Sequence, residues 1–450
     1  MKIITGAEFD GYWKNQAAAS RDETVEAAVK EIIAAVRSEG DAAVRRYAAR
    51  FDKSAPATPE IPAAAAKTAW EKLAAEDAKL AAALELAAGH IRLFSEKQKE
   101  QFAGFEYEIA PGLMTGQRII PVQRAAVYAP GGRFPLISSV LMGVIPALCA
   151  GAGEVFLVSP PDEGGLPERR ILAAAHLAGG GFPGRLRIFA IGGAQAVAAL
   201  ALGTETVPRA DLIAGPGNRY VAAAKRLLYG EVGIDFVAGP TDVLIICGPA
   251  AGGADSSVQA AGFTAADMLA QAEHDPDARA RALVPSRERA EAVSAALEQR
   301  LALLPTAETA RASLEAGGLI IIYKDRDEAA RIANAIAPEH LELQTADAES
   351  WIPLLKNYGS LFIGTMAVEA LGDYSAGINH TLPTAGSARF TGGLSVRTFL
   401  KTVTTLRSSE GEGYEAARAA AEIIARAEGL AGHAESAALR KGGGQPGICA

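Results

Sequence analysis

The stretch Leu186-Arg187-Ile188-Phe189-Ala190-Ile191-Gly192-Gly193-Ala194-Gln195 decides the fold class, because a short apolar run ends in two glycines and leads into a helical pattern. Working outward, the same order of apolar run, turn residues and helical pattern recurs over residues 125–132, 155–161 and 211–218. Nearly continuous apolar strands that alternate with helices indicate a parallel sheet covered on both faces. We therefore predict an α/β protein with two doubly wound, Rossmann-like parallel-sheet domains.

The pattern also predicts how the chain is divided. Residues 1–25 are expected to form a helical arm. One Rossmann-like domain is expected to be discontinuous, built from residues 26–130 and 239–385, and to flank a second one over residues 131–238. Residues 386–450 differ in character, because an Ala-rich helical stretch is followed by a Gly-rich end.

The composition is that of an ordinary globular chain. Its 450 residues are 49% hydrophobic and 21% charged, which suits two or more domains with cores of their own. The net charge of −8, without a block of Lys and Arg, argues against nucleic acid as a partner. No stretch is apolar enough for a secretory signal or a membrane span. Three scattered cysteines, Cys149, Cys247 and Cys449, argue against a disulfide framework, so we expect a cytoplasmic protein without a membrane partner.

A polar tetrapeptide, Gln271-Ala272-Glu273-His274, ends an apolar helical run. Gln271 and His274 are three apart and share a helix face, so a side-chain oxygen and an imidazole nitrogen can reach one cation. Zinc and similar divalent ions accept such ligands. Gln, Glu and His are also common at a solvated helix end, and these four residues alone leave both interpretations open.

Three glycine loops, at residues 130–132, 192–195 and 215–220, should meet at one edge of a doubly wound sheet. The loops after parallel strands gather at that edge and bind ligands there. Glycine lets the backbone approach a ligand closely, and helix N-termini attract anions, so a bound dinucleotide is one interpretation. The usual G-x-G-x-x-G fingerprint is absent, and tight turns without a ligand are the other interpretation.

An adjacent Glu and His follow Pro338, namely Glu339 and His340. Such a pair can divide acid–base work, because the ordinary pKa values of Glu and His lie on either side of the working range. A surface loop is the competing interpretation.

A second polar segment places Asp373, Tyr374 and His380 between glycines, which is a composition expected of a binding loop. Glu428 and His433 flank a short linker near the C-terminus, and by themselves they are typical of capping or surface residues. Spacing alone does not show whether these residues converge.

Taken together, the chain resembles the histidinol dehydrogenase family over nearly its whole length. Several sequence blocks in the family's order carry the resemblance: residues 36–41, 127–132, 192–196, 214–218, 271–274, 337–341, 372–384 and 428–433. The resemblance implies an NAD-dependent enzyme with one zinc ion per subunit. Members of the family oxidise L-histidinol, through L-histidinaldehyde, to L-histidine with two NAD, which is the last step of histidine biosynthesis.

The resemblance also assigns roles. It places the zinc and catalytic groups in the discontinuous domain and NAD on the 131–238 domain. Zinc would be held by Gln271, His274, Asp373 and His433. NAD-binding positions correspond to Tyr128, Gln195 and Asn218. Substrate-binding positions correspond to Thr241, Gln271, His274, His340, Asp373, Tyr374, His380, Glu428 and His433.

In the family, the active sites of a homodimer are shared, and His433 and Glu428 would reach the partner's site. The N- and C-terminal helical segments would then be exchanged between subunits. Glu339 and His340 correspond to the catalytic acid–base pair. A neutral His340 suits removal of the hydroxyl proton, and Glu339 can activate the water that adds to the aldehyde. Zinc would mainly orient the amino alcohol.

Two departures from the family bear on the substrate. Thr241-Asp242 stands where histidinol enzymes usually have Ser-Glu, and residues 133–139 replace a common Tyr-Pro-Ser stretch. These variants resemble related zinc- and NAD-dependent dehydrogenases of sulfonated propanediols, which are the alternative function. A non-catalytic metal-binding protein is the alternative from another class. A cysteine-based aldehyde dehydrogenase does not suit the placement of the cysteines, because none has a neighbouring group that would activate a thiolate.

Overall fold

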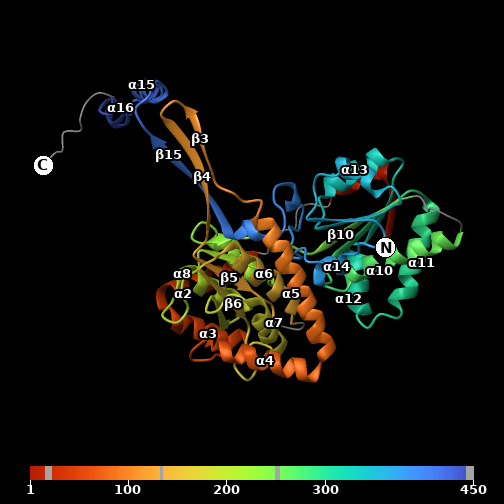
Figure 1. Ribbon diagram of the computed structural model, residues 1–450. Coiled ribbons are helices and arrows are strands. Elements are labelled where there is room, and N and C mark those ends of the chain that lie inside the picture. The colour runs from red at the N-terminus through yellow and green to blue at the C-terminus, as the bar shows by residue number, and fades with distance from the viewer. Residues whose placement is uncertain (16–22, 132–134, 249–253, 442–450) are drawn as a thin grey trace. The chain divides into compact units, whose positions relative to one another are not determined.

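The computed structural model describes residues 1–15, 23–131, 135–248 and 254–441 (Figure 1). The chain forms two units. The first comprises Met1–Lys97 and Val122–Phe399, and the second comprises Gln98–Pro121 and Leu400–Ala450. No helix in the described ranges is long and apolar enough to cross a membrane.

One six-stranded sheet of the first unit has the order β1-β12-β11-β10-β13-β14, and all its neighbouring strands are parallel. Helices cover both faces, as the continuous apolar strands predicted. The strands are β1 (Lys2–Thr5), β10 (Asp242–Cys247), β11 (Arg279–Val284), β12 (Leu319–Ile322), β13 (His340–Gln344) and β14 (Ser360–Ile363). The helices are α1 (Gly6–Asn15), α10 (Ala254–Ala272), α11 (Arg287–Leu301), α12 (Ala307–Gly317), α13 (Arg326–Ile336) and α14 (Glu369–Tyr374).

The other six-stranded sheet has the order β2-β7-β6-β5-β8-β9 and is parallel except for β2. It contains the strand–glycine–helix stretch that decided the fold class. The strands are β2 (Glu60–Ile61), β5 (Arg124–Tyr128), β6 (Glu154–Ser159), β7 (Leu186–Ala190), β8 (Leu212–Ala214) and β9 (Gly233–Ile234). The helices are α2 (Glu23–Glu39), α3 (Asp41–Phe51), α4 (Ala63–Glu76), α5 (Ala78–Lys99), α6 (Ile137–Ala150), α7 (Arg169–Gly179), α8 (Gly193–Leu202) and α9 (Arg219–Leu228).

The N-terminal part of the chain is divided between the two sheets differently from what was expected. Residues 26–130 were expected to join residues 239–385, but β2 and β5 lie in the sheet of residues 131–238. The apolar stripe of α2 packs into the core of that same sheet. The expected helical arm over residues 1–25 begins with a strand, β1, paired to β12. An amphipathic helix shows which face is buried but not against which sheet, so the sequence pattern could not decide this point.

The second unit contains a three-stranded antiparallel sheet with the order β15-β4-β3. Its strands are β3 (Phe105–Ala110), β4 (Leu113–Pro121) and β15 (Leu400–Ser408). The helices α15 (Glu412–Ala427) and α16 (Ala431–Ala438) follow β15. The C-terminal segment was expected to contain a helix and a Gly-rich end, so the strand β15 at its start is a correction. Its run of Val and Thr is typical of a strand, because β-branched side chains fit a pleated sheet.

Candidate active site

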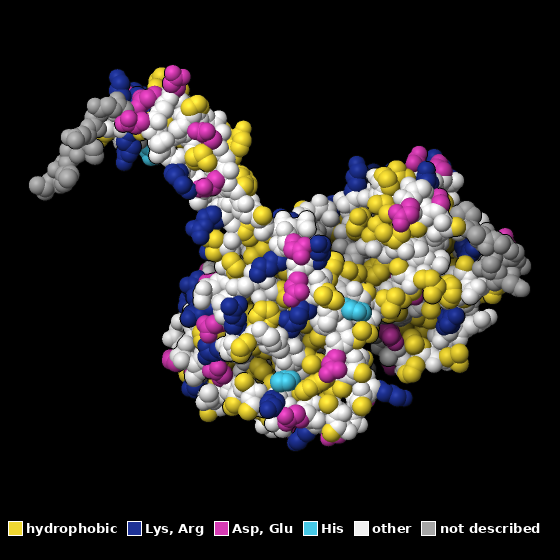
Figure 2. Space-filling model, viewed as in Figure 1, with side chains coloured by type: hydrophobic (Ala, Val, Ile, Leu, Met, Phe, Trp, Pro, Cys, Tyr) yellow, Lys and Arg dark blue, Asp and Glu magenta, His cyan; other side chains and the backbone are white. Residues whose placement is uncertain are grey.

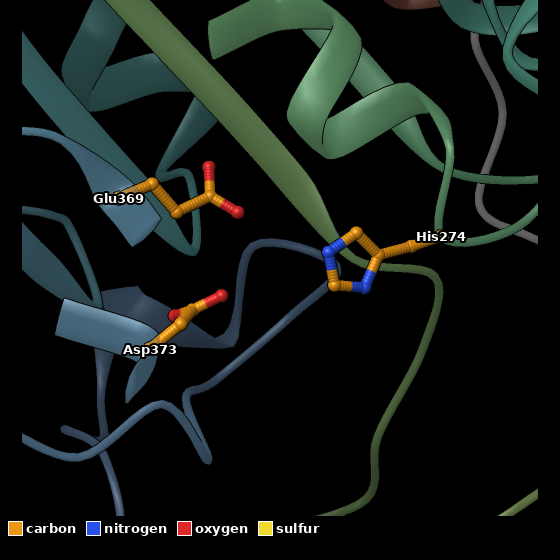
Figure 3. Close-up of side chains that lie close together, drawn as sticks. All are labelled: His274, Glu369 and Asp373. Carbon is orange, nitrogen blue, oxygen red and sulfur yellow. The ribbon is translucent and has the colours of Figure 1, made fainter. Parts of the chain in front are cut away.

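Three side chains at the centre of the site point toward one another: His274, Glu369 and Asp373 (Figure 3). Each offers one ligand atom, and these atoms all lie within 4.8 Å of one another. His274 follows the end of α10, whereas Glu369 and Asp373 share a face of α14. An imidazole nitrogen and carboxylate oxygens are ligands that zinc and similar divalent cations accept. The residues present therefore fit a divalent cation.

Gln271 lies fully buried in the last turn of α10, next to these three residues. We assign its amide so that the nitrogen faces the two carboxylate oxygens of Glu369, at 2.5 and 3.0 Å, and the oxygen lies 2.6 Å from Thr241 Oγ1. Thr241 Oγ1 also lies 2.5 Å from Glu339 Oε2, and the one proton of this hydroxyl is donated to only one of the two acceptors at a time. The predicted ligand Gln271 thus adjoins the three donors, and its oxygen must turn away from Thr241 to join them.

Glu339 and His340 stand at the start of β13, where β10 holds them. His340 Nδ1 lies 3.3 Å from the carbonyl oxygen of Asp242. A carbonyl only accepts, so we assign the proton of the neutral ring to Nδ1. His340 Nε2 lies 3.5 Å from Asp373 Oδ1 and makes no hydrogen bond with any described residue. A buried nitrogen without a hydrogen-bond partner among the described residues therefore faces Asp373, one of the three candidate metal donors.

Burial and charge act on this pair in opposite directions. Burial disfavours the charged ring of His340, but neighbouring carboxylates, Glu369 first, outweigh burial and raise the pKa of His340 well above its ordinary value. Burial raises the pKa of Glu339 to about 7, against the opposing charge of His340. A divalent cation held by His274 and Asp373 would add positive charge nearby and lower the pKa of His340. The neutral base predicted for His340 therefore depends on that cation.

Glu369 was missed among the predicted site residues. Burial raises the pKa of Glu369 well above its ordinary value, although the charge of His340 opposes the shift. The available signal was the spacing of Glu369 and Asp373, which are four apart and share one helix face. The helix that carries them has 6 residues, too few to show an apolar stripe, so the sequence pattern did not reveal it.

A cavity of about 210 Å³ opens onto these groups. One side is formed at the amino ends of strands of the all-parallel sheet and carries Thr241, Glu339 and His340. The other side includes Pro216 and Gly217, from the glycine loop that follows β8 in the other sheet. The cavity thus lies between the amino edge of one sheet and the carboxyl edge of the other.

Tyr374 and His380, both predicted to bind substrate, line the same cavity. His380 Nδ1 lies 2.9 Å from the carbonyl oxygen of Asp373, and Nε2 lies 3.1 Å from Ser139 Oγ. Burial lowers the pKa of His380, which favours the neutral form of its ring. The structure therefore gathers six predicted substrate positions around one cavity: Thr241, His274, His340, Asp373, Tyr374 and His380.

The predicted cofactor residues Tyr128 and Asn218 lie at the carboxyl edge of the second sheet. Tyr128 Oη accepts a hydrogen bond from Gly193 N at 3.1 Å, and burial raises the pKa of Tyr128 to about 12. Asn218 caps α9 through its side-chain oxygen. Gly215 has a φ of 105°, and a Cβ there would lie 2.3 Å from Tyr128 O, so only glycine lets these loops meet.

Gln195, the third predicted cofactor residue, is 1% exposed. Its amide donates to Asp52 Oδ2 at 3.3 Å, and the same oxygen accepts from Gly192 N at 3.1 Å. Asp52 was not predicted, because it ends α3 far earlier in the chain and no local motif marks it. Its carboxylate holds the glycine loop that precedes α8.

The two departures from the family pattern differ in position. Thr241 lines the cavity, whereas Asp242 is buried and accepts from Arg281 Nη1 at 3.1 Å. Asp242 therefore acts inside the sheet and not toward a substrate. In the loop over 133–139, Arg133 and Phe134 lie outside the described residues, while Leu136, Ser138 and Ser139 line the cavity.

The remaining predicted positions belong to the second unit. Glu428 and His433 stand on either side of the turn between α15 and α16, and both are exposed. The structure therefore does not test their roles as ligands of substrate and metal. Cys149 and Cys247 are buried, as expected of core residues, and Cys449 lies outside the described residues.

Comparison with known proteins identifies the family. A sequence model of the histidinol dehydrogenase family matches residues 15–441. Histidinol dehydrogenase of Thermus thermophilus is 47% identical over 422 residues, covering 94% of this chain and 96% of that protein. The Pseudomonas aeruginosa enzyme is 43% identical over 422 residues, covering 93% and 91%. The crystal structure of histidinol dehydrogenase from Elizabethkingia anophelis matches with a TM-score of 0.87 at 32% identity, covering 98% of this chain and 97% of that chain. This chain belongs to the histidinol dehydrogenase family.

Proposed function

We propose that this chain oxidises L-histidinol, through L-histidinaldehyde, to L-histidine with two NAD, as the last step of histidine biosynthesis. The observation that carries the proposal is the unpartnered Nε2 of buried His340, which faces Asp373 beside the cation-binding donors. An alcohol held at those donors would present its hydroxyl to a basic nitrogen. The names of the relatives support histidinol as that alcohol.

The cation is proposed to be zinc, held by Gln271, His274 and Asp373 together with His433 of the partner subunit. When bound, zinc would orient the amino alcohol and polarise its oxygen. The Gln271 amide nitrogen faces Glu369, so the amide would rotate to turn its oxygen, the proposed ligand atom, toward the three donors. The donor distances among His274, Glu369 and Asp373 support this placement.

The protein side of the chemistry is proton handling. NAD, when bound, accepts the hydride in each of the two oxidations. His340 is proposed to take the hydroxyl proton through Nε2 as each hydride leaves. Glu339 is proposed to take a proton from the water that adds to the aldehyde. A pKa of about 7 suits Glu339 to this exchange, because the carboxyl group can hold or release a proton at neutral pH.

Substrate and cofactor are proposed to meet in the cavity between the two sheets. Tyr374 and His380 line it and would contact the substrate beyond the reacting carbon, together with Glu428 of the partner subunit. Tyr128, Gln195 and Asn218 lie at the glycine loops and would form the NAD side. Tyr128 and Gln195 are buried; Tyr128 accepts from Gly193 of the glycine loop, and Gln195 donates to Asp52, which also accepts from Gly192, and these bonds support a role in shaping the NAD site.

A homodimer with shared active sites is proposed from the second unit. Phe105, Tyr107 and Ile109 alternate along the edge strand β3, and they are 58%, 65% and 60% exposed. An edge strand with an exposed apolar face is a site of association. Figure 2 shows further hydrophobic side chains on this unit among charged ones. Burial of this surface against a second copy would bring α16 and His433 to the partner.

The proposal is tested by counting NADH formed from a limiting amount of L-histidinol. Two NADH per substrate, with L-histidine as the product, is the expected result. One NADH per substrate would mean that the reaction stops at the aldehyde and would contradict the second oxidation. If the protein does not oxidise histidinol but does oxidise a sulfonated propanediol, the sulfonated alcohol is the substrate and the proposal is wrong.

A further inference from the structure

Helix α6 contains a proline at position 146, in a segment whose side chains are almost all buried. Proline has no N–H, so the carbonyl four residues earlier, that of Met142, loses its helical donor. Met142 is 0% exposed. A buried carbonyl without a donor is costly, so another group must supply one.

Asn379 supplies that donor from a distant part of the chain. Its Nδ2 donates to the carbonyl oxygen of Met142 at 2.6 Å. Its Oδ1 accepts from Thr381 N at 2.9 Å. Both ends of the amide are therefore used, and the orientation of residues 379–381 is fixed against α6.

His380 stands inside this segment and is held by the same helix. Ser139 Oγ, one turn before Met142 on α6, lies 3.1 Å from His380 Nε2. His380 Nδ1 lies 2.9 Å from the carbonyl oxygen of Asp373. The carbonyl only accepts, so Nδ1 is the donor and Nε2 accepts from Ser139. A chain of contacts thus runs from α6 through Asn379 and His380 to a proposed metal ligand.

We infer that Pro146 and Asn379 are positioning residues, and that together they set His380 and, through its ring, Asp373. Pro146 frees the Met142 carbonyl, and Asn379 uses it as an anchor point. The inference for turnover rests on the proposed function, whereas the inference for metal binding rests on the contacts alone. A helix without the proline would close its own hydrogen bond and leave Asn379 with a weaker partner.

The test compares Pro146→Ala, Asn379→Ala and the double variant. Zn²⁺ is titrated into metal-stripped protein by calorimetry, and kcat and KM for L-histidinol are measured with saturating NAD. Pro146→Ala should be at least as stable to heat, because Ala favours a helix, yet bind Zn²⁺ about tenfold more weakly. Its kcat should also fall about tenfold. The double variant should lose no more than the worse single variant, because both changes break one anchor.

Asn357→Ala is the matched control, since Asn357 also donates to a main-chain carbonyl, that of Asn334 at 3.0 Å, outside the site. It should keep wild-type Zn²⁺ affinity. If Pro146→Ala does not fold, Asn379→Asp supplies the test, because it keeps the volume and the acceptor but removes the donor. Wild-type Zn²⁺ affinity in the anchor variants, or additive losses in the double variant, would overturn the inference. If the wild-type protein does not oxidise histidinol, the proposed function is wrong. Weaker Zn²⁺ binding in the anchor variants would still support the inference about the anchor.

Discussion

Asp242 and Glu339 are joined in both directions. Asp242 Oδ1 accepts from Glu339 N at 3.1 Å, and Asp242 N donates to Glu339 Oε2 at 3.2 Å. The other oxygen of Asp242 accepts from buried Arg281. The start of each strand is therefore fixed by the other, and the carboxylate of Glu339, the proposed catalytic group, is positioned by a residue that does not line the cavity.

This relationship predicts a large effect on stability at position 242 and almost none at the adjacent position 241. Asp242→Ala should lower the free energy of unfolding by about 3–5 kcal/mol, because it leaves the charge of Arg281 buried without its partner. Thr241→Ser keeps the hydroxyl beside Glu339 and should leave both stability and turnover near wild type. Urea unfolding and steady-state kinetics of the two variants measure these effects. Equal stability of Asp242→Ala and wild type would contradict the role of Asp242 inside the sheet.

His274→Ala should remove the metal while the protein stays folded. His274 is exposed, so its truncation opens no core cavity. Turnover should fall by more than about a hundredfold, because the substrate loses its orientation. Metal analysis, circular dichroism and kinetics are the measurements, and His176→Ala on α7 is the control. Full activity of a metal-free His274→Ala protein would exclude the site.

Glu339→Gln should stall the reaction after the aldehyde stage. The amide cannot take a proton from water, whereas His340 can still accept the hydroxyl proton of the first oxidation. The rate of acid formation should fall by about 10²–10⁴. Added L-histidinaldehyde should likewise be oxidised slowly by the variant. Quantification of aldehyde and acid by chromatography tests this role, and an undiminished yield of L-histidine would contradict it.

The same residue predicts a pH dependence of stability in the metal-free protein. Burial raises the pKa of Glu339 from 4.5 to about 7, so the folded protein binds more protons than the unfolded protein within this window. The unfolding free energy should therefore decrease as pH rises from 4.5 to 7, by up to about 3 kcal/mol from this group. Glu339→Gln should lose less stability between pH 5 and pH 8 than wild type. Parallel pH profiles of the two proteins would refute the shift.

Mixing two inactive chains tests the shared site. A heterodimer of His274→Ala and His433→Ala chains has one intact site, and random mixing makes half of the dimers heterodimers. About a quarter of wild-type activity should return. Absence of recovery, in a sample where mass spectrometry shows heterodimers, would count against donation of His433 between subunits.

The sequence predicted the strands and helices better than it predicted which sheet each of them joins. The runs before Gly192 and Gly215 are strands, because continuous apolar residues followed by glycine suit a covered parallel sheet. Family membership confirmed the resemblance carried by the ordered motifs. The stripe of α2 showed a buried face but not its sheet. The strand β15 was missed because the helical pattern beyond it dominated the interpretation of the C-terminal segment.

The candidate site shows the same limit. Gln271 and His274 could be paired by helical spacing, because both stand on one helix. Asp52 acts through contacts with residues far away in the chain that no local motif marks, and the spacing of Glu369 and Asp373 lies on a helix too short to stand out. Pro146 is visible in the sequence as a proline in a helix, but only the fold shows which side chain uses the carbonyl that it frees.

The position of the cavity, at the amino edge of one sheet and the carboxyl edge of the other, has a consequence for a reaction that consumes two carriers in succession. The groups proposed to bind the half-oxidised carbon belong to one sheet, and those proposed to bind NAD belong to the other. In this arrangement, NADH formed in the first oxidation can leave its sheet and be exchanged for NAD. The reactive aldehyde can meanwhile stay bound to the groups of the all-parallel sheet.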